Sequence, residues 1–444
     1  MKALFNLLRE SLSKHKLTRD IAWSMGSFFI LAVSGIVINI VVTAVRDAAA
    51  LGVFNLAYAV YIVVSQFAVW GIHYSVLRYS AYYSDDVDQR SIMLSTACAI
   101  ALTLGSLFAV AIYLAEPLFV KAFDSAQTGE AIKYAAFGLV VFPVNKVLLA
   151  YLNGLREMKS FSLLQGLRYG TVMIVVSAVA LSDQPDSVMT IGFLVAELLT
   201  ALLAIFMIVK GRLARLRAVS VLWIRQHLVF GSKGLFGGMF AEVNSRIDVL
   251  LIGFFLDERA TGIYSFAAML VDGLYHVLAM IRINFNPVLV EAVRDGNWTQ
   301  ACQLRTQSSR FVRPVVLGLT AVLVVSYLVL AGVVVTDKGL MEGLPSLLIL
   351  LLGLNVIAVL VPFDNLMVVS GHPGRQAIQQ VGTVSVNAVV AIILVPWLGI
   401  EGAATGTAMS YLAGIFMLYV FTKALLGWDL LRNQAPESRP SADR

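Results

Sequence analysis

The sequence has little charge and no long polar segment. Only 14% of its 444 residues are charged, whereas 59% are hydrophobic, and the mean hydropathy is +0.82. A soluble domain contains about 25% charged residues, so a chain this apolar could not cover its surface in water. A helix of roughly 20 apolar residues crosses a bilayer. We therefore predict an all-α integral membrane protein without a soluble domain, and the net charge of +6 does not indicate nucleic-acid binding.

Cysteine and enzymatic motifs are equally scarce. Cys98 lies in an apolar run and Cys302 in a polar loop, and we predict that both are unpaired, which excludes a disulfide framework or a cysteine metal site. The sequence contains no phosphate-binding glycine loop, no HExxH or CxxC motif and no plausible Ser-His-Asp set. We therefore expect no catalytic residues, no metal, no enzymatic activity and no cofactor other than a coupling proton or sodium ion.

Long apolar runs recur along the whole chain. Each is long enough for a transmembrane helix, and only short connections separate them. We predict twelve spans, at residues 21–45, 53–75, 91–115, 132–152, 161–181, 187–209, 229–255, 261–286, 314–335, 344–368, 376–396 and 399–425.

The basic residues orient these spans. When the connecting segments are assigned alternately to the two sides, 25 of the 33 Lys and Arg fall on the side of the N-terminus, and three lie within spans. The opposite side receives only Arg46, Lys121, Lys133, Arg259 and Lys338. Lys and Arg are enriched in cytoplasmic loops, so we predict that both termini are cytoplasmic.

The spans and their charges divide the chain into five segments. The first twenty residues are basic and lack a signal-peptide cleavage site. We expect an amphipathic cytoplasmic tail at 1–20, a six-helix lobe at 21–209, a basic cytoplasmic linker at 210–228, a second six-helix lobe at 229–425, and a disordered cytoplasmic tail at 426–444.

A short repeat links the two predicted lobes. DAAALGVFNLA at 47–57 and DERATGIYSFA at 257–267 share an Asp, a Gly and two Ala at a constant offset, and they also align Phe54 with Tyr264. Chance similarity between two turns is one explanation. An internal duplication is the other, and an even number of intervening spans would make the lobes parallel in topology. We predict two such lobes around a central cavity.

Four stretches resemble a known family. The stretches are GVFNLAYAVYIVVSQFAVWGIHYSVLRYSA at 52–81, NGLREMKSF at 153–161, RIDVLLIGFFLDERATGIYSFAAML at 246–270, and SGHPGRQA at 370–377 followed by VNAVVAIILVPWLGIEGAATGTAMSYL at 386–412. In these stretches the chain resembles the polysaccharide (Wzx-type) flippases, within the superfamily of multidrug, oligosaccharidyl-lipid and polysaccharide (MATE-like) exporters.

The resemblance implies a transporter that works by alternating access. Such proteins flip lipid-linked oligosaccharide repeat units to the outer leaflet, where O-antigen, capsule or exopolysaccharide is assembled. It also implies a bacterial cytoplasmic (inner) membrane location, a polyprenyl-diphosphate-linked substrate, and a polysaccharide polymerase and other assembly proteins as partners. Lipid II flippases of this superfamily usually have fourteen spans, and twelve spans argue against that substrate. The alternatives are a MATE-type cation-coupled multidrug or metabolite exporter and a membrane-embedded polysaccharide polymerase or ligase.

Three basic residues within spans are candidates for binding the diphosphate. Lys146 follows Pro143, where a kink would free a carbonyl group. Arg246 could instead pair with Glu242 one turn before it, and Arg282 could extend to the inner interface. Ionisable residues in a membrane span are costly and therefore indicate function.

The span at 261–286 carries several of the polar candidates. Asp272, Tyr275, His276 and Arg282 fall within an arc of roughly 120° on a helix, which is typical of a wall that lines water or of a polar contact between helices. His276 is the candidate substrate contact among them, beside Arg282.

Carboxylates and aromatic rings complete the predicted site. Glu197, Asp272 and Asp364 lie in spans and could couple transport to an ion, although each could equally be a structural partner of a basic residue. Tyr58 and Tyr61 could stack on sugar rings, although tyrosines also form ordinary interfacial belts.

Overall fold

The structure is a computed structural model that describes residues 2–336 and 338–436. Side chains are described except those of residues 2–18, 21, 22, 234, 236–238, 241, 283, 284 and 287. The described residues form helices and no β-strand. The predicted amphipathic character of segment 1–20 depends on side chains that lie almost wholly outside the described set.

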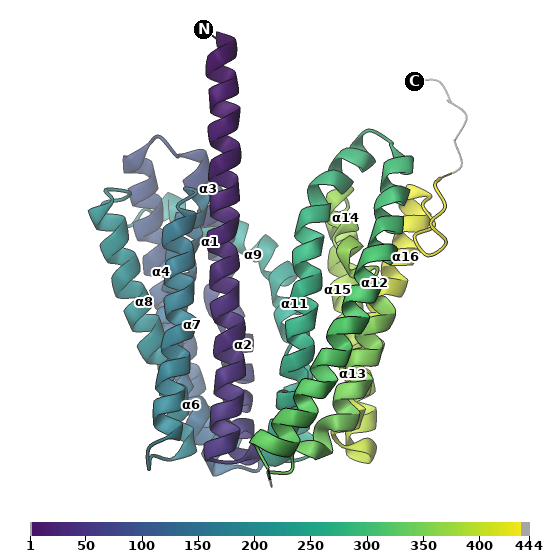
Figure 1. Cartoon of the computed structure of the whole chain (residues 1–444). Coiled ribbons are helices and arrows are strands. Elements are labelled where there is room, and N and C mark those ends of the chain that lie inside the picture. The colour runs from purple at the N-terminus through teal and green to yellow at the C-terminus, as the bar shows by residue number, and fades with distance from the viewer. Residues whose placement is uncertain (1, 337, 437–444) are drawn as a thin grey trace. The chain divides into compact units, whose positions relative to one another are not determined.

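The chain divides into two compact units (Figure 1). Unit 1 contains Met1–Arg46 and Ala57–Met239, and unit 2 contains Asp47–Leu56 and Phe240–Arg444. The helices of the first half are α1 (Lys2–Val45), α2 (Ala48–Val69), α3 (Ile72–Tyr82), α4 (Val87–Leu114), α5 (Glu116–Phe123), α6 (Ala126–Gly154), α7 (Met158–Ala180), α8 (Ile191–Lys210) and α9 (Val221–Asn244). Those of the second half are α10 (Ile247–Phe255), α11 (Glu258–Arg294), α12 (Trp298–Val329), α13 (Leu344–Ile357), α14 (Leu366–Val369), α15 (Pro373–Leu398) and α16 (Ile400–Phe421).

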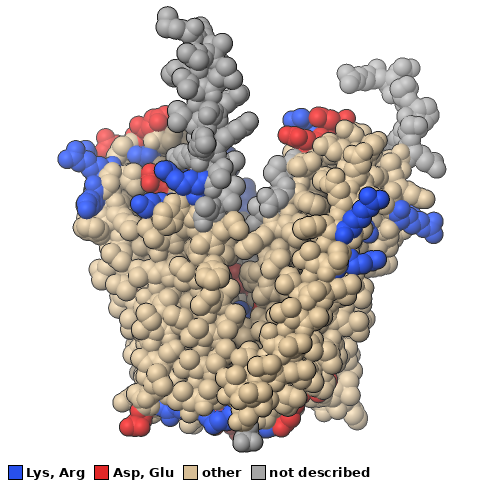
Figure 2. Space-filling model, in the orientation of Figure 1, with Lys and Arg blue, Asp and Glu red and all other residues tan. Residues whose placement is uncertain are grey.

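Eleven helices of the described residues are long and apolar enough to cross a membrane. They correspond to all the predicted spans except the seventh, 229–255, which consists of the end of α9 and the whole of α10. A turn at Ser245 and Arg246 separates these two helices. The structure thus confirms the all-α, multi-pass fold, and the seventh predicted span is not one continuous helix. Figure 2 shows charged side chains gathered at the two ends of each unit, on the face in view.

Two other predicted spans are also discontinuous. The second breaks between α2 and α3, where Trp70 and Gly71 both have positive φ angles (48° and 66°). The tenth, 344–368, begins as α13 and then passes through a 3-10 turn at Val361–Phe363 and the short helix α14. Pro362 lies in that turn, and a proline cannot continue a regular helix because it has no N–H to donate.

The two copies of the repeat contact each other within unit 2. Asp47 and Asp257 each accept a hydrogen bond from the backbone N–H three residues later, at 2.8 and 2.7 Å, and so each caps a helix. A Cβ at Gly52 would overlap the carbonyl oxygen of Glu258, and one at Gly262 would overlap that of Ala48. Because the contacts are reciprocal, the two helix starts cross at equivalent positions.

Part of the predicted C-terminal tail packs on unit 2. Trp428 and Leu430 are fully buried in its core, together with Leu289 and Phe363. The backbone N–H of Arg432 donates to Asp429 at 2.9 Å, and this hydrogen bond lowers the pKa of the Asp429 carboxyl group. Residues 437–444 of the predicted tail lie outside the described residues.

Candidate functional site

Unit 1 contains a buried polar cluster around Glu197, in α8. The Arg168 guanidinium, in α7, donates to Oε1 of this carboxylate at 2.5 and 2.6 Å. Asn145, in α6, donates to Oε2 at 2.6 Å and to the Glu197 carbonyl oxygen at 2.7 Å. The Tyr61 hydroxyl donates to Oε1 at 3.3 Å. We call Tyr61, Asn145, Arg168 and Glu197 the Glu197 cluster, in which both carboxylate oxygens have partners.

Aromatic rings enclose this cluster. The guanidinium of Arg168 lies 4.8 Å from the centre of the Phe142 ring, and the Lys146 ammonium lies 5.6 Å from the same ring centre. A cation near a ring face is attracted by the ring quadrupole. The two cations therefore share one aromatic partner, and Arg168 is the one that pairs with Glu197.

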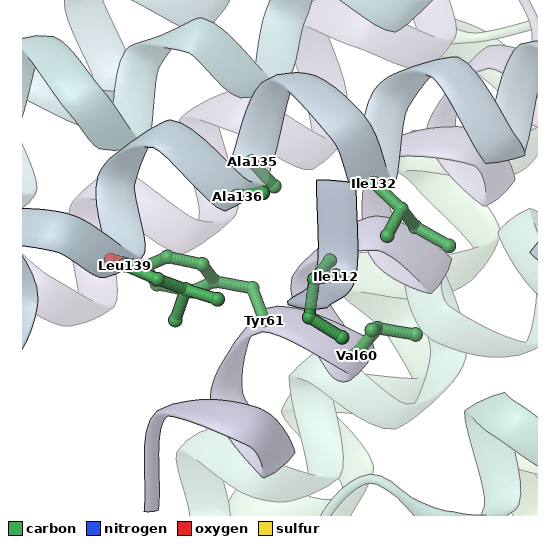
Figure 3. A pocket seen from close by; sticks show the side chains of 7 residues that line it. All are labelled: Val60, Tyr61, Ile112, Ile132, Ala135, Ala136 and Leu139. Atoms are coloured by element: carbon green, nitrogen blue, oxygen red, sulfur yellow. The ribbon is translucent and has the colours of Figure 1, made fainter. Parts of the chain in front are cut away.

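The two candidate tyrosines lie in the same part of unit 1. Tyr61 is 2% exposed and stacks on Phe193 at a centroid distance of 4.8 Å, and Tyr58 lies 5.6 Å from the same ring. One side of Tyr61 borders a narrow apolar recess (Figure 3), lined otherwise by Val60, Ile112, Ile132, Ala135, Ala136 and Leu139. Sugar binding by Tyr58 and Tyr61 stays a prediction, and in this conformation the Tyr61 ring is covered.

Unit 2 contains a second cluster at the break of its tenth span. Asp364 follows the 3-10 turn and accepts a hydrogen bond from Arg282 of α11 at 3.1 Å. Gln379 of α15 donates to the other carboxylate oxygen at 3.0 Å and to the Gly414 carbonyl oxygen at 3.1 Å. We call Arg282, Asp364 and Gln379 the Asp364 cluster. The side chains of Arg282 and Asp364 are 21% and 18% exposed.

The remaining candidates of unit 2 lie on α11 or at the α9–α10 break. Asp272 is half-buried, and His276, one turn later, is exposed and donates from Nδ1 to the Asp272 carbonyl oxygen at 2.6 Å. Tyr275 stacks with Tyr411 of α16 at 6.3 Å. Arg246 stands at the start of α10, so the regular helical spacing that would pair it with Glu242 is interrupted.

Charged residues therefore coincide with helix breaks in unit 2. Arg246 lies at the break of the seventh span, and Asp364 at that of the tenth. In secondary transporters, discontinuous helices form the substrate and ion sites, because their free backbone groups line a cavity. Arg246 and the Asp364 cluster therefore both stand at discontinuous helices of unit 2.

Sequence reasoning missed three residues of these clusters. The alternation of charges assigned Arg168 to the cytoplasmic side, whereas the structure places it within α7, paired with Glu197. Its position inside the run 161–181 was the available signal, since a charge in a span is costly. Asn145 and Gln379 carry no charge and gave no comparable signal.

Comparisons with known proteins agree with this architecture. In three dimensions the chain is similar to a lipid II flippase, MurJ, in an inward closed conformation, with a TM-score of 0.75, 15% identity, and coverage of 93% of this chain and 90% of that one. It is also similar to an inward-facing MATE family multidrug transporter of the MOP superfamily, with a TM-score of 0.69, 13% identity, and coverage of 93% and 100%. A third similar structure is the MATE multidrug transporter DinF-BH, with a TM-score of 0.62, 12% identity, and coverage of 92% and 95%.

Sequence comparison identifies the family. No curated protein matches the chain. A family model described as polysaccharide biosynthesis protein matches residues 46–336, which is more than half of the chain. The family predicted from the four sequence stretches is thereby confirmed: this multi-pass membrane protein belongs to the polysaccharide biosynthesis protein family.

Proposed function

We propose that this protein flips lipid-linked oligosaccharide repeat units from the cytoplasmic to the outer leaflet, for assembly of a surface polysaccharide. Membership of the polysaccharide biosynthesis family supports this substrate class, and the fold shared with a lipid II flippase supports the reaction. The proposal places the protein in a bacterial cytoplasmic membrane with both termini inside. Its partners are the bilayer, a polyprenyl-diphosphate-linked oligosaccharide, and the polymerase that uses the flipped units. It makes or breaks no covalent bond.

The Arg282–Asp364 pair carries the mechanism. A diphosphate linker must keep its charges neutralised while it crosses, because an unpaired charge in the bilayer is costly. Arg282 can supply that neutralisation, since a guanidinium binds phosphate oxygens with two parallel hydrogen bonds. Its present partner is a carboxylate that is partly exposed at a helix break. A diphosphate that takes Arg282 from Asp364 leaves Asp364 to bind a proton or a sodium ion.

This exchange couples substrate and cation in one site. Two negative charges leaving an inside-negative cell gain about 2 × 2.3 kcal/mol per 100 mV. Cationic side chains that move with the substrate cancel part of that gain. A cation that binds Asp364 and enters the cell on the return step supplies free energy again, and so keeps transport in the outward direction. Lys146 and Arg246 are the further proposed phosphate contacts, with Tyr58, Tyr61 and His276 for the sugars, and Asp272 as a second proposed coupling carboxylate.

A MATE-type exporter is the second candidate function, because two of the similar folds are MATE transporters. An exporter of cationic compounds needs a substrate cavity lined by accessible carboxylates. In unit 1, the carboxylate of Glu197 is 2% exposed and is bonded to Arg168 and Asn145. This arrangement favours the anionic, lipid-linked substrate over a cationic one, and it leaves Glu197 as the weakest of the three proposed coupling carboxylates.

Reconstitution tests the proposal directly. Purified protein in proteoliposomes should move a polyprenyl-diphosphate-linked oligosaccharide between leaflets, with ion gradients and membrane potential set independently. A cationic dye provides the matched alternative substrate. Transport of the dye without movement of the lipid-linked sugar would contradict the flippase proposal and support the exporter. In cells, deletion should abolish surface polysaccharide while lipid-linked repeat units are retained inside.

A further inference from the structure

The linker between α8 and α9 is bound along the start of α4, within unit 1. The backbone N–H of Arg215 donates to the Ser91 hydroxyl at 2.9 Å, and that of Arg217 donates to Ser95 at 3.1 Å. Further along, the N–H of Ser220 donates to Thr96 at 3.1 Å. Three hydroxyl groups on one helix thus hold the linker backbone in a defined path.

This path runs from the end of a membrane span into its first turns. Helix α4 begins at Val87, and its span covers Val87–Leu114. From Ser91 to Thr96 the helix rises by about 7.5 Å, at 1.5 Å per residue. Because the apolar run of α4 begins near Ser91, we infer that the linker lies at the depth of the headgroups and the uppermost acyl chains, where an amphipathic segment can bind the membrane surface.

The side chains that the linker and the first residues of α9 present are both aliphatic and basic. Leu216 is 95% exposed, Val221 81% and Leu222 72%. Arg212, Arg215 and Arg217 are exposed among them, and Arg217 contacts Asp88. At interfacial depth, exposed aliphatic side chains are stabilised by contact with acyl chains. Guanidinium groups next to them are stabilised by hydrogen bonds to lipid phosphates.

We propose that residues 212–222, which are the linker and the first two residues of α9, form a binding site for anionic phospholipid headgroups. Leu216, Val221 and Leu222 enter the acyl layer, while Arg212 and Arg215 bind the phosphates. The charge complementarity selects an anionic over a zwitterionic headgroup, because one basic residue near an anionic surface strengthens binding about fivefold (about 1 kcal/mol). The assignment to the cytoplasmic leaflet depends on the proposed topology, whereas the headgroup chemistry depends only on the linker.

Native mass spectrometry of the full chain measures the headgroup preference. The wild-type protein should retain phosphatidylglycerol over phosphatidylethanolamine, and Arg212→Gln with Arg215→Gln should weaken that retention about 25-fold, the product of two fivefold factors. Arg156→Gln with Lys159→Gln is the matched control, because these exposed residues carry the same charge in the α6–α7 connection and the first turn of α7. Equal retention of both lipids, or an equal loss in the control, would overturn the proposal.

Spin labelling measures the depth independently of headgroup and transport. With Cys98 and Cys302 replaced by Ala, a label at Leu216→Cys should be more accessible to oxygen than to a water-soluble nickel chelate. A label at Arg156→Cys should show the opposite. A Leu216 label that is as accessible to the nickel chelate as the Arg156 label places the linker in water and rejects the site. A retained lipid that proves to be the polyprenyl diphosphate instead of phosphatidylglycerol also rejects it.

Discussion

The Glu197 cluster of unit 1 and the Asp364 cluster of unit 2 have the same chemical parts in different surroundings. Each has a carboxylate, an arginine and a side-chain amide, contributed by separate segments. Glu197 is 2% exposed and belongs to the continuous helix α8, whereas Asp364 is 18% exposed and lies in a break. A buried carboxylate whose two oxygens both accept hydrogen bonds indicates a structural ion pair. A partly exposed carboxylate at a helix break indicates an ion pair in which a ligand can replace one partner.

This difference has a physical basis. Removing one partner of a buried ion pair leaves an uncompensated charge and is strongly destabilising. A partly exposed pair allows water or a ligand to replace either partner, so its separation is less costly. We therefore expect substitutions in the Glu197 cluster to lower stability first, and substitutions in the Asp364 cluster to lower transport first.

The largest effect should come from Arg282→Ala. Loss of the guanidinium removes two hydrogen bonds to a charged substrate, each worth about 1.5–3 kcal/mol, so export of lipid-linked units should fall at least about a hundredfold. Surface polysaccharide in a deletion strain measures export, and a membrane immunoblot measures insertion. Asp364→Asn should also impair export. Normal export by both variants would remove the Asp364 cluster from the mechanism.

The second effect concerns the stability of unit 1. Glu197→Leu leaves Arg168 buried and should destabilise the protein by about 3–5 kcal/mol, as measured by thermal unfolding in detergent. Adding Arg168→Met should recover most of that loss, because an apolar pair of similar volume replaces both charges. If the double variant is stable yet inactive in export, Glu197 has a coupling role and the contrast between the clusters fails.

A smaller effect should follow from the crossing of the repeat copies. Gly52→Ala and Gly262→Ala each place a methyl group against a carbonyl oxygen, and overpacking of this kind costs about 1–3 kcal/mol. Similar losses in the two variants would support equivalent packing of the copies. Gly170→Ala is the control, since nothing lies within 4 Å of its Cβ position, and it should not destabilise. Unequal effects, with one site tolerant, would argue against equivalence.

The smallest effect should come from an exposed ion pair of unit 2. Arg259 and Glu342 form two hydrogen bonds, at 2.6 and 2.9 Å, and their side chains are 50% and 58% exposed. Exposed pairs contribute about 0–1 kcal/mol. Arg259→Gln should therefore leave export and the unfolding temperature almost unchanged. A loss of export comparable to that of Arg282→Ala would show that pairing alone, without partial burial at a break, determines function.

The sequence by itself determined the membrane class, the approximate spans and the repeated start of each lobe. Helix length and apolarity are local properties, and the bilayer imposes both on a segment of about 20 residues. The same argument singled out Glu197, Asp272, Asp364, Lys146, Arg246 and Arg282, because a charge within an apolar run is visible without a structure.

Only the tertiary structure decided which charged side chains form ion pairs with one another. Arg168 and Glu197 are 29 residues apart, and Arg282 and Asp364 are 82 apart. The rotation and crossing of packed helices determine contacts across such distances, and helical periodicity within one span carries no information about them. The break at Ser245 and Arg246 was hidden for the same reason, because an apolar run has the same composition whether its helix is continuous or interrupted.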